Sequence, residues 1–156
     1  MQAETQIREI EQKVNGLLAA NPSHFLVEIR IKPTNNVKVF IDGDQGVILS
    51  DLILYNRRLY KELEESSLFP DGDFSLEVSS PGLDEPLKLF RQYKKNVGRF
   101  VEVTLTDTIK KEGKLLDATP DGILIETETG KGKKKEIKQE TILFEHIKHT
   151  KIQIKF

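Results

Sequence analysis

The stretch that decides the fold is FSLEVSSPGLDEPL at residues 74–87, where a strand pattern runs directly into a rigid turn. Apolar and polar residues alternate over 74–79, which is the pattern of a half-buried strand. The Pro81-Gly82 pair that follows fits a type II turn, because proline fixes φ at one position and glycine accepts the positive φ of the next. We therefore expect one folded unit to end here and a second to begin.

The residues before this strand carry the pattern of a small α+β domain. Apolar side chains recur at helical spacing near the N-terminus, and Asn21-Pro22 ends that helix because proline cannot continue it. The predicted elements are a helix over residues 3–20, strands over 25–31, 37–41 and 74–79, and a helix that Ser50 caps and that ends near Glu65. This α-β-β-α-β order predicts a small sheet with two helices on one face, an α+β sandwich.

The residues after the turn carry a different pattern, of short strands with glycines at the bends. We expect strands over residues 99–105, 109–118, 123–127, 134–138 and 151–156, and short helical segments over 87–96 and 140–147. Gly113 lies inside a strand pattern, where a sharply bent strand needs the missing side chain. The pattern resembles the opening of Sm-like and SH3-like barrels, so the sequence predicts a small β-barrel.

The distribution of charge favours a division into two domains. Residues 1–80 hold 8 Lys and Arg against 13 Asp and Glu, a balance of −5. Residues 81–156 hold 16 against 12, a balance of +4, and the two balances sum to the net charge of −1. The sign changes at the turn. We therefore expect an N-terminal α+β domain over 1–82 and a C-terminal SH3-like barrel domain over 83–156, with different partners.

The chain lacks the residue sets that catalysis or metal binding requires. It has no Cys, and His146 and His149 have no third ligand in a recognisable metal motif. The acids of the loop at 42–46 lack the spaced oxygen ligands and the closing Glu of a calcium loop. We expect no enzyme activity, no metal and no cofactor.

The densest basic run surrounds residues 130–138. Its lysines are Lys131, Lys133, Lys134, Lys135 and Lys138. Two interpretations stay open: a solvated hairpin tip, or a loop that contacts RNA phosphates without reading sequence. If the loop is only a tip, a basic surface is expected around Lys110, Lys111 and Lys114.

The run LEVSSPGLDEPL at residues 76–87 resembles the hallmark motif of the ribosome maturation factor RimP family. Further similarity lies in Val39-Phe-Ile-Asp42, in Gly46-Val-Ile-Leu-Ser-Asp51 and in Arg57. The resemblance implies a non-catalytic assembly factor that binds the free, immature small ribosomal subunit and a ribosomal protein near the decoding centre. The positive charge of the C-terminal half adds rRNA as an expected partner. The alternative is a free-standing RNA-binding regulator that acts through the basic barrel.

The motif itself has two possible roles, which stay open. It binds a partner, or it stiffens the junction between the domains because its two prolines restrict the chain there, and the two roles are compatible. Its candidate residues are Ser79, Ser80, Pro81, Gly82, Leu83, Asp84 and Pro86. No apolar run approaches the roughly 18 residues of a membrane helix, and the N-terminus lacks the layout of a signal peptide. We expect a cytoplasmic monomer without membrane contact.

Overall fold

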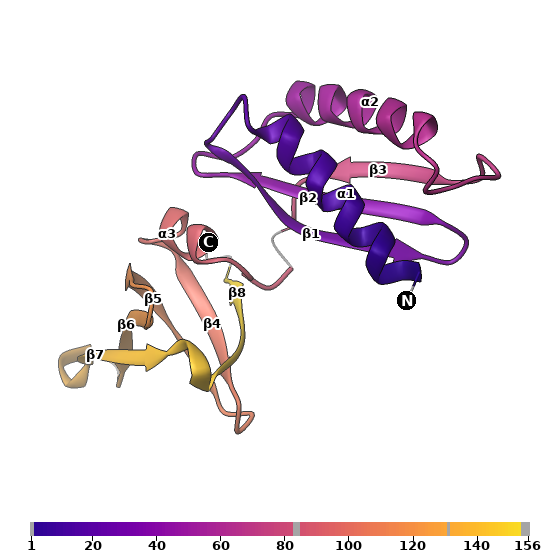
Figure 1. The fold of residues 1–156 in the computed structure, drawn as a ribbon. Helices are drawn as coiled ribbons and strands as arrows, with labels where there is room; N and C mark the ends of the chain where they lie inside the picture. The colour runs from indigo at the N-terminus through magenta and orange to yellow at the C-terminus, as the bar shows by residue number, and fades with distance from the viewer. Residues whose placement is uncertain (1, 83–84, 131, 154–156) are drawn as a thin grey trace. The chain divides into compact units, whose positions relative to one another are not determined.

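The chain forms two compact units, Met1–Pro81 and Gly82–Phe156, each with its own buried core (Figure 1). The computed structural model describes residues 2–82, 85–130 and 132–153, with the backbone alone described at residues 2, 3 and 134. The division between the units falls inside the stretch at 74–87, where the strand pattern meets the turn.

The N-terminal unit has the predicted α-β-β-α-β order. Its elements are α1 (Gln2–Leu18), β1 (His24–Lys32), β2 (Asn36–Gly43), α2 (Leu49–Glu65) and β3 (Ser75–Ser79). The strands form one sheet in the order β1-β2-β3. β1 and β2 pair as an antiparallel hairpin, whereas β2 and β3 pair in parallel because the connection through α2 brings the chain back to the end of the sheet at which β2 begins.

The core of this unit lies between the sheet and the two helices. Val37, Val39 and Ile41 alternate along β2 and are buried, while the residues between them are half-buried on the other face. Both helices pack against each other and cover the same face of the sheet, as predicted (Figure 1). Their buried contributions are Ile10, Val14 and Leu18 from α1 and Leu52, Tyr55, Leu59 and Leu63 from α2.

The predicted N-cap of α2 is wrong. Ile48 occupies the N-cap position without a side-chain hydrogen bond, so Ser50 lies in the first turn instead. The amides of Asp51 and Leu52 already donate to the Ile48 carbonyl, at 3.1 and 3.3 Å. Ile48 and Leu49 are 64 % and 71 % exposed. Water can therefore satisfy the free amides of this end, and no serine cap is needed.

The loop after β2 folds tightly over His24. A Cβ at Gly43 would lie 2.2 Å from the carbonyl oxygen of Gly46 and 3.0 Å from Cδ2 of His24. The Gly46 amide donates to the Gly43 carbonyl at 2.9 Å, and Gly46 has a φ of 86°. Only a residue without a side chain fits at position 43 while this loop keeps its shape.

We expect Gly43→Ala to lower the free energy of unfolding by about 1–3 kcal/mol, because backbone must shift to admit the methyl group. Gly16→Ala is the matched control, since nothing lies within 4 Å of a Cβ at this α1 position. That control should be stabilising by ~0.5–1 kcal/mol. Urea titration of both variants measures the difference, and equal effects would show that the loop rearranges freely.

The C-terminal unit is built on a five-stranded antiparallel sheet in the order β7-β6-β5-β4-β8. Its strands are β4 (Phe100–Leu105), β5 (Lys110–Ala118), β6 (Gly122–Thr129), β7 (Glu136–Leu143) and β8 (Ile147–Ile152). Its helical elements are α3 (Phe90–Lys95) and the short 3-10 turns η1 (Gly132–Lys134) and η2 (Phe144–His146). The buried core comprises Tyr93, Val101, Val103, Leu115, Ala118, Ile123, Ile125 and Ile142.

Three predicted elements of this unit are corrected. The strand expected at 134–138 begins and ends later, as β7, and pairs with β6 from Gly122 to Thr129. This continuous ladder also takes up the first half of the helical segment expected at 140–147, so only η2 is helical there. The last strand is β8 rather than 151–156, and residues 154–156 lie outside the described residues.

Gly113 has the role that a bent strand gives to glycine. A Cβ there would lie 2.6 Å from the carbonyl oxygen of Glu126 on β6. The register of the β5–β6 pair also shifts between Leu115 and Asp117, which bends the strand further. Within the described residues the outer strands β7 and β8 are not hydrogen-bonded to each other, so the observed element is an antiparallel sheet.

Candidate nucleic-acid and partner interface

The first half of the candidate motif emerges from β3. Ser79 is the last residue of that strand, half-buried and paired with Phe40 of β2. Ser80 and Gly82 are exposed, and Pro81 is half-buried between them. The strand thus holds the motif at Ser79 and then presents its next residues to solvent.

The second half of the motif is held by backbone hydrogen bonds. The Glu85 amide donates to the Gly82 carbonyl at 3.0 Å. After the half-buried Pro86, the Leu87 amide donates to the Thr150 carbonyl of β8 at 2.7 Å. Leu83 and Asp84 lie outside the described residues. The motif is therefore anchored in β3 at one end and on β8 at the other.

The basic run lies at the tip of the β6–β7 hairpin. Lys133 in η1 is exposed, as is Lys138 in β7. Lys135 forms an ion pair with Glu128 of β6, with Nζ 3.1 Å from Oε2. Only the backbone of Lys134 is described, and Lys131 lies outside the described residues. One charge of this run is thus already matched by an acid, and those of Lys133 and Lys138 face solvent.

The alternative basic surface on β5 is more strongly neutralised. The ammonium of Lys110 lies 3.7 Å from a carboxylate oxygen of Glu102, and that of Lys111 donates a hydrogen bond to Glu140. Lys114 is half-buried. Because a lysine whose charge is already neutralised by a carboxylate attracts a phosphate less strongly, this surface is the weaker candidate for RNA.

A buried His–Tyr pair that the sequence analysis missed joins β1 to α2. Nδ1 of His24 lies 2.6 Å from the Tyr55 hydroxyl, and its Nε2 lies 3.9 Å from Asp51 Oδ2. Burial raises the pKa of Tyr55, and the negative charge of Asp51 raises it further. The hydroxyl is therefore protonated at neutral pH, and it shares a hydrogen bond with Nδ1. His24 and Tyr55 are only 8 % and 7 % exposed, so the pair fastens the fold.

The described residues contain neither a candidate metal cluster nor a candidate membrane-spanning helix. Among them, no three His, Asp or Glu side chains gather closely enough to hold a metal ion. No helix there combines the length and apolar character that a bilayer crossing needs.

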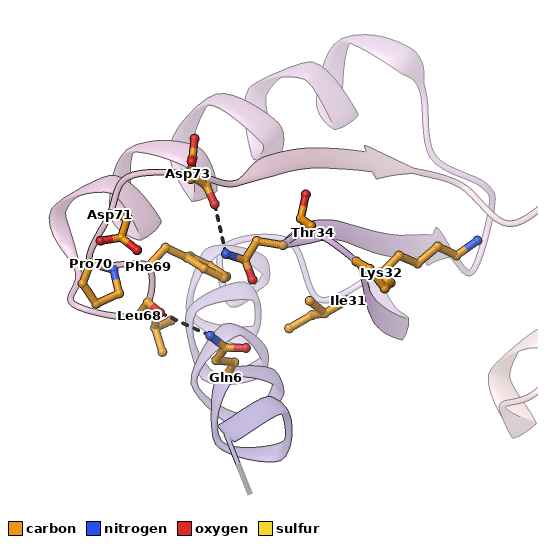
Figure 2. A pocket seen from close by; sticks show the side chains of 11 residues that line it. Gln6, Ile31, Lys32, Thr34, Leu68, Phe69, Pro70, Asp71 and Asp73 are labelled. Atoms are coloured by element: carbon orange, nitrogen blue, oxygen red, sulfur yellow. Dashed lines mark hydrogen bonds between the residues drawn. The ribbon is translucent and has the colours of Figure 1, made fainter.

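A hollow lies at the end of the N-terminal sheet where the β1–β2 turn is (Figure 2). It is lined by α1, by that turn and by the loop before β3. The Gln6 amide donates to the Leu68 carbonyl at 3.3 Å, and the Asn35 amide donates to the Asp73 carbonyl at 3.1 Å. Figure 2 draws the two hydrogen bonds as dashed lines, at Leu68 and at Asp73. These amides fasten the turn and the loop to the helix, which is a structural role.

A second hollow lies on the C-terminal unit, beside α3 and β8. Three aromatic side chains and two lysines line it, together with proline, aliphatic and imidazole groups. Its lining residues are Pro86, Leu87, Lys88, Phe90, Tyr93, Pro120, Phe144, Ile147, Lys148 and His149. We refer to these ten residues as the aromatic groove.

Comparison with known proteins covers almost the whole chain. A family model described as the RimP N-terminal domain matches residues 18–84 and so ends within the motif. A ribosome maturation factor RimP from Christiangramia forsetii is 34 % identical over 154 residues, which span 95 % of this chain and 97 % of that protein. The chain belongs to the RimP family.

Other members of the RimP family are similar to the same extent. The ribosome maturation factor RimP of Flavobacterium psychrophilum is 37 % identical over 155 residues, 95 % of this chain and 97 % of that protein. The one from Cytophaga hutchinsonii is 32 % identical over 137 residues, 86 % of this chain and 82 % of that protein. These names describe maturation factors, a non-catalytic role, and agree with the prediction that the chain is not an enzyme.

Proposed function

We propose that this chain is a non-catalytic assembly factor that matures the small ribosomal subunit. It binds the free, immature subunit and a small-subunit ribosomal protein near the decoding centre. The observation that carries the proposal is similarity along 95 % of the chain to proteins named ribosome maturation factor RimP. The LEVSSPGLDEPL run supports it, because that run is the motif by which the chain resembles this family.

The two units divide this work by charge. The N-terminal domain, residues 1–82, carries the acidic excess and suits a basic ribosomal protein, since opposite potentials speed encounter and disfavour wrong partners. The C-terminal domain, residues 83–156, carries the basic excess and faces rRNA through the β6–β7 hairpin tip. The motif at Ser79 to Pro86 joins the domains and contributes to partner contact. The chain acts as a cytoplasmic monomer.

The C-terminal sheet curls into an SH3-like, Sm-like barrel. The close approach of β6 to Gly113 favours this form, as do the register shifts in the β5–β6 and β4–β8 pairs. Bulges and strand glycines of this kind are how a small sheet curves around its own core. Fold-level likeness does not by itself assign a ligand, so the rRNA partner rests on charge and family.

Deleting the gene tests the function. We expect a sucrose gradient of the deletion strain to show fewer mature small subunits, more small subunits that are not joined to large ones, and unprocessed small-subunit rRNA. A plasmid copy of the intact gene should restore the profile. Normal subunit ratios with fully processed rRNA in the deletion strain would refute the proposal. The second candidate, an RNA-binding regulator that acts through the basic domain, predicts messenger RNA in place of immature subunits in a pull-down from lysate.

A further inference from the structure

The aromatic groove combines a flat apolar wall with positive charge at its rim. It has a volume of about 600 Å³, within the ~300–1,000 Å³ typical of ligand sites. Phe90 is 37 % exposed and is the most open of its aromatic side chains. Behind it, Phe144 packs edge-on against the buried Tyr93, with ring centroids 5.0 Å apart. A planar ligand can therefore lie on Phe90 and reach a wall of further rings.

Hydrogen bonds fix the walls of the groove before any ligand arrives. The side-chain oxygen of the buried Gln92 accepts the amides of Lys88 and Leu89 at 2.6 and 2.9 Å, which holds the segment that leads into α3. The Tyr93 hydroxyl donates to Thr150 Oγ1 at 2.9 Å. Burial raises the pKa of Tyr93 more than this hydrogen bond lowers it. A site that is already ordered loses less entropy on binding.

The charge of the groove selects the class of ligand. Lys88 and Lys148 line it and are exposed, and none of the described residues that line it is acidic. Lys94 lies over one face of the Phe90 ring, with Nζ 5.6 Å from the centroid, so the other face is the one open to a ligand. Because Lys94 is paired with Asp117 at 3.7 Å, the charge offered to a ligand comes from the two exposed lysines at the rim. An aromatic groove alone would also suit a proline-rich peptide. Lysines around an aromatic platform favour a ligand with both a flat ring and a negative backbone.

We propose that the aromatic groove binds an unpaired nucleotide of single-stranded RNA, with its base stacked on Phe90 and its phosphates beside Lys88 and Lys148. Base stacking on an aromatic ring is tolerant of sequence, because every base has a π-face. The groove thus gives the C-terminal domain a means of distinguishing unpaired from paired RNA. The hairpin lysines lack this ability, since they contact phosphates alone. The inference rests on the proposed role in rRNA assembly and extends it.

The test uses the full-length protein and a short, fluorescently labelled oligouridine, with binding followed by anisotropy. Phe90→Leu keeps an apolar side chain but removes the π-face, and should weaken binding about five- to 150-fold, the equivalent of one lost stack. Phe100→Leu is the matched control: Phe100 is 38 % exposed, belongs to the same unit and lies outside the groove. It should change affinity by about twofold at most.

A second variant keeps the test decisive if Phe90→Leu fails to fold. Lys148→Gln should lower the slope of log K against log salt by about 0.7, the value for one phosphate contact with a single strand. Equal affinities of the wild type and Phe90→Leu for the RNA, or a proline-rich synthetic peptide that binds the groove more tightly than oligouridine, would overturn the proposal. If immature subunits still bind the wild type while oligouridine does not, the groove inference fails and the assembly function stands.

Discussion

Replacing Leu59 by alanine is expected to lower the free energy of unfolding of the N-terminal unit by about 2–5 kcal/mol and to leave the C-terminal unit unchanged. Leu59 is 1 % exposed and packs in the cluster between α1, α2 and the sheet. The truncation leaves a cavity that neighbouring elements fill only in part. For a unit of this size, the transition should move down by at least ~8 °C.

The measurement is calorimetry of the full chain with two companion variants. Leu49→Ala is the same truncation on the same helix, but Leu49 is 71 % exposed, so it should have an effect within about 0.5 kcal/mol. Leu115→Ala removes a fully buried side chain from the other core and should move only the second transition. A single transition that shifts alike in both core variants would mean that residues 1–82 and 83–156 do not unfold as separate domains.

The pattern of apolar and polar residues within a segment predicts those helices and strands whose two faces differ in burial. The alternation at residues 37–41 gives β2 because one face of that strand meets the helices and the other does not. The corrections arise where partners distant in sequence decide. Glu140 to Leu143 continue β7 because β6 offers a full ladder of backbone hydrogen bonds. The sequence of residues 140–143 alone does not indicate this ladder, because the partner strand β6 lies elsewhere in the chain. The local pattern therefore predicts a helical segment there.

The candidate functional surfaces also differ in whether the sequence alone can reveal them. The motif and the lysine run are contiguous in the sequence and could be identified by reading along it. The aromatic groove could not, because Phe90 and Phe144 come from opposite ends of the C-terminal unit and reach the same hollow only when the unit folds. The one available signal was an aromatic residue near a basic one in each segment, Lys88 before Phe90 and Phe144 before Lys148. Many surface segments share that signal.

Changing Lys133, Lys134 and Lys135 together to glutamine is expected to weaken binding to the immature subunit and to flatten its dependence on salt. Each phosphate contact that is lost lowers the slope of log K against log salt by about 0.7–0.9, since fewer counterions are then released on binding. Folding should be unaffected, because Lys133 and Lys135 are exposed at the hairpin tip and exposed lysines contribute little to stability. Filter binding at several salt concentrations measures the slope.

Single variants show which lysine matters. Lys135 is already paired with Glu128, whereas Lys133 is exposed, so Lys133→Gln should flatten the slope more than Lys135→Gln. Lys110→Gln serves as the control, because Lys110 is paired with Glu102 on the β5 surface. An unchanged slope in the triple variant would make the hairpin tip a solvated loop. The positive charge that contacts rRNA would then have to come from the groove lysines, Lys88 and Lys148. Replacing these two lysines distinguishes the aromatic groove from the hairpin tip as the RNA-binding surface.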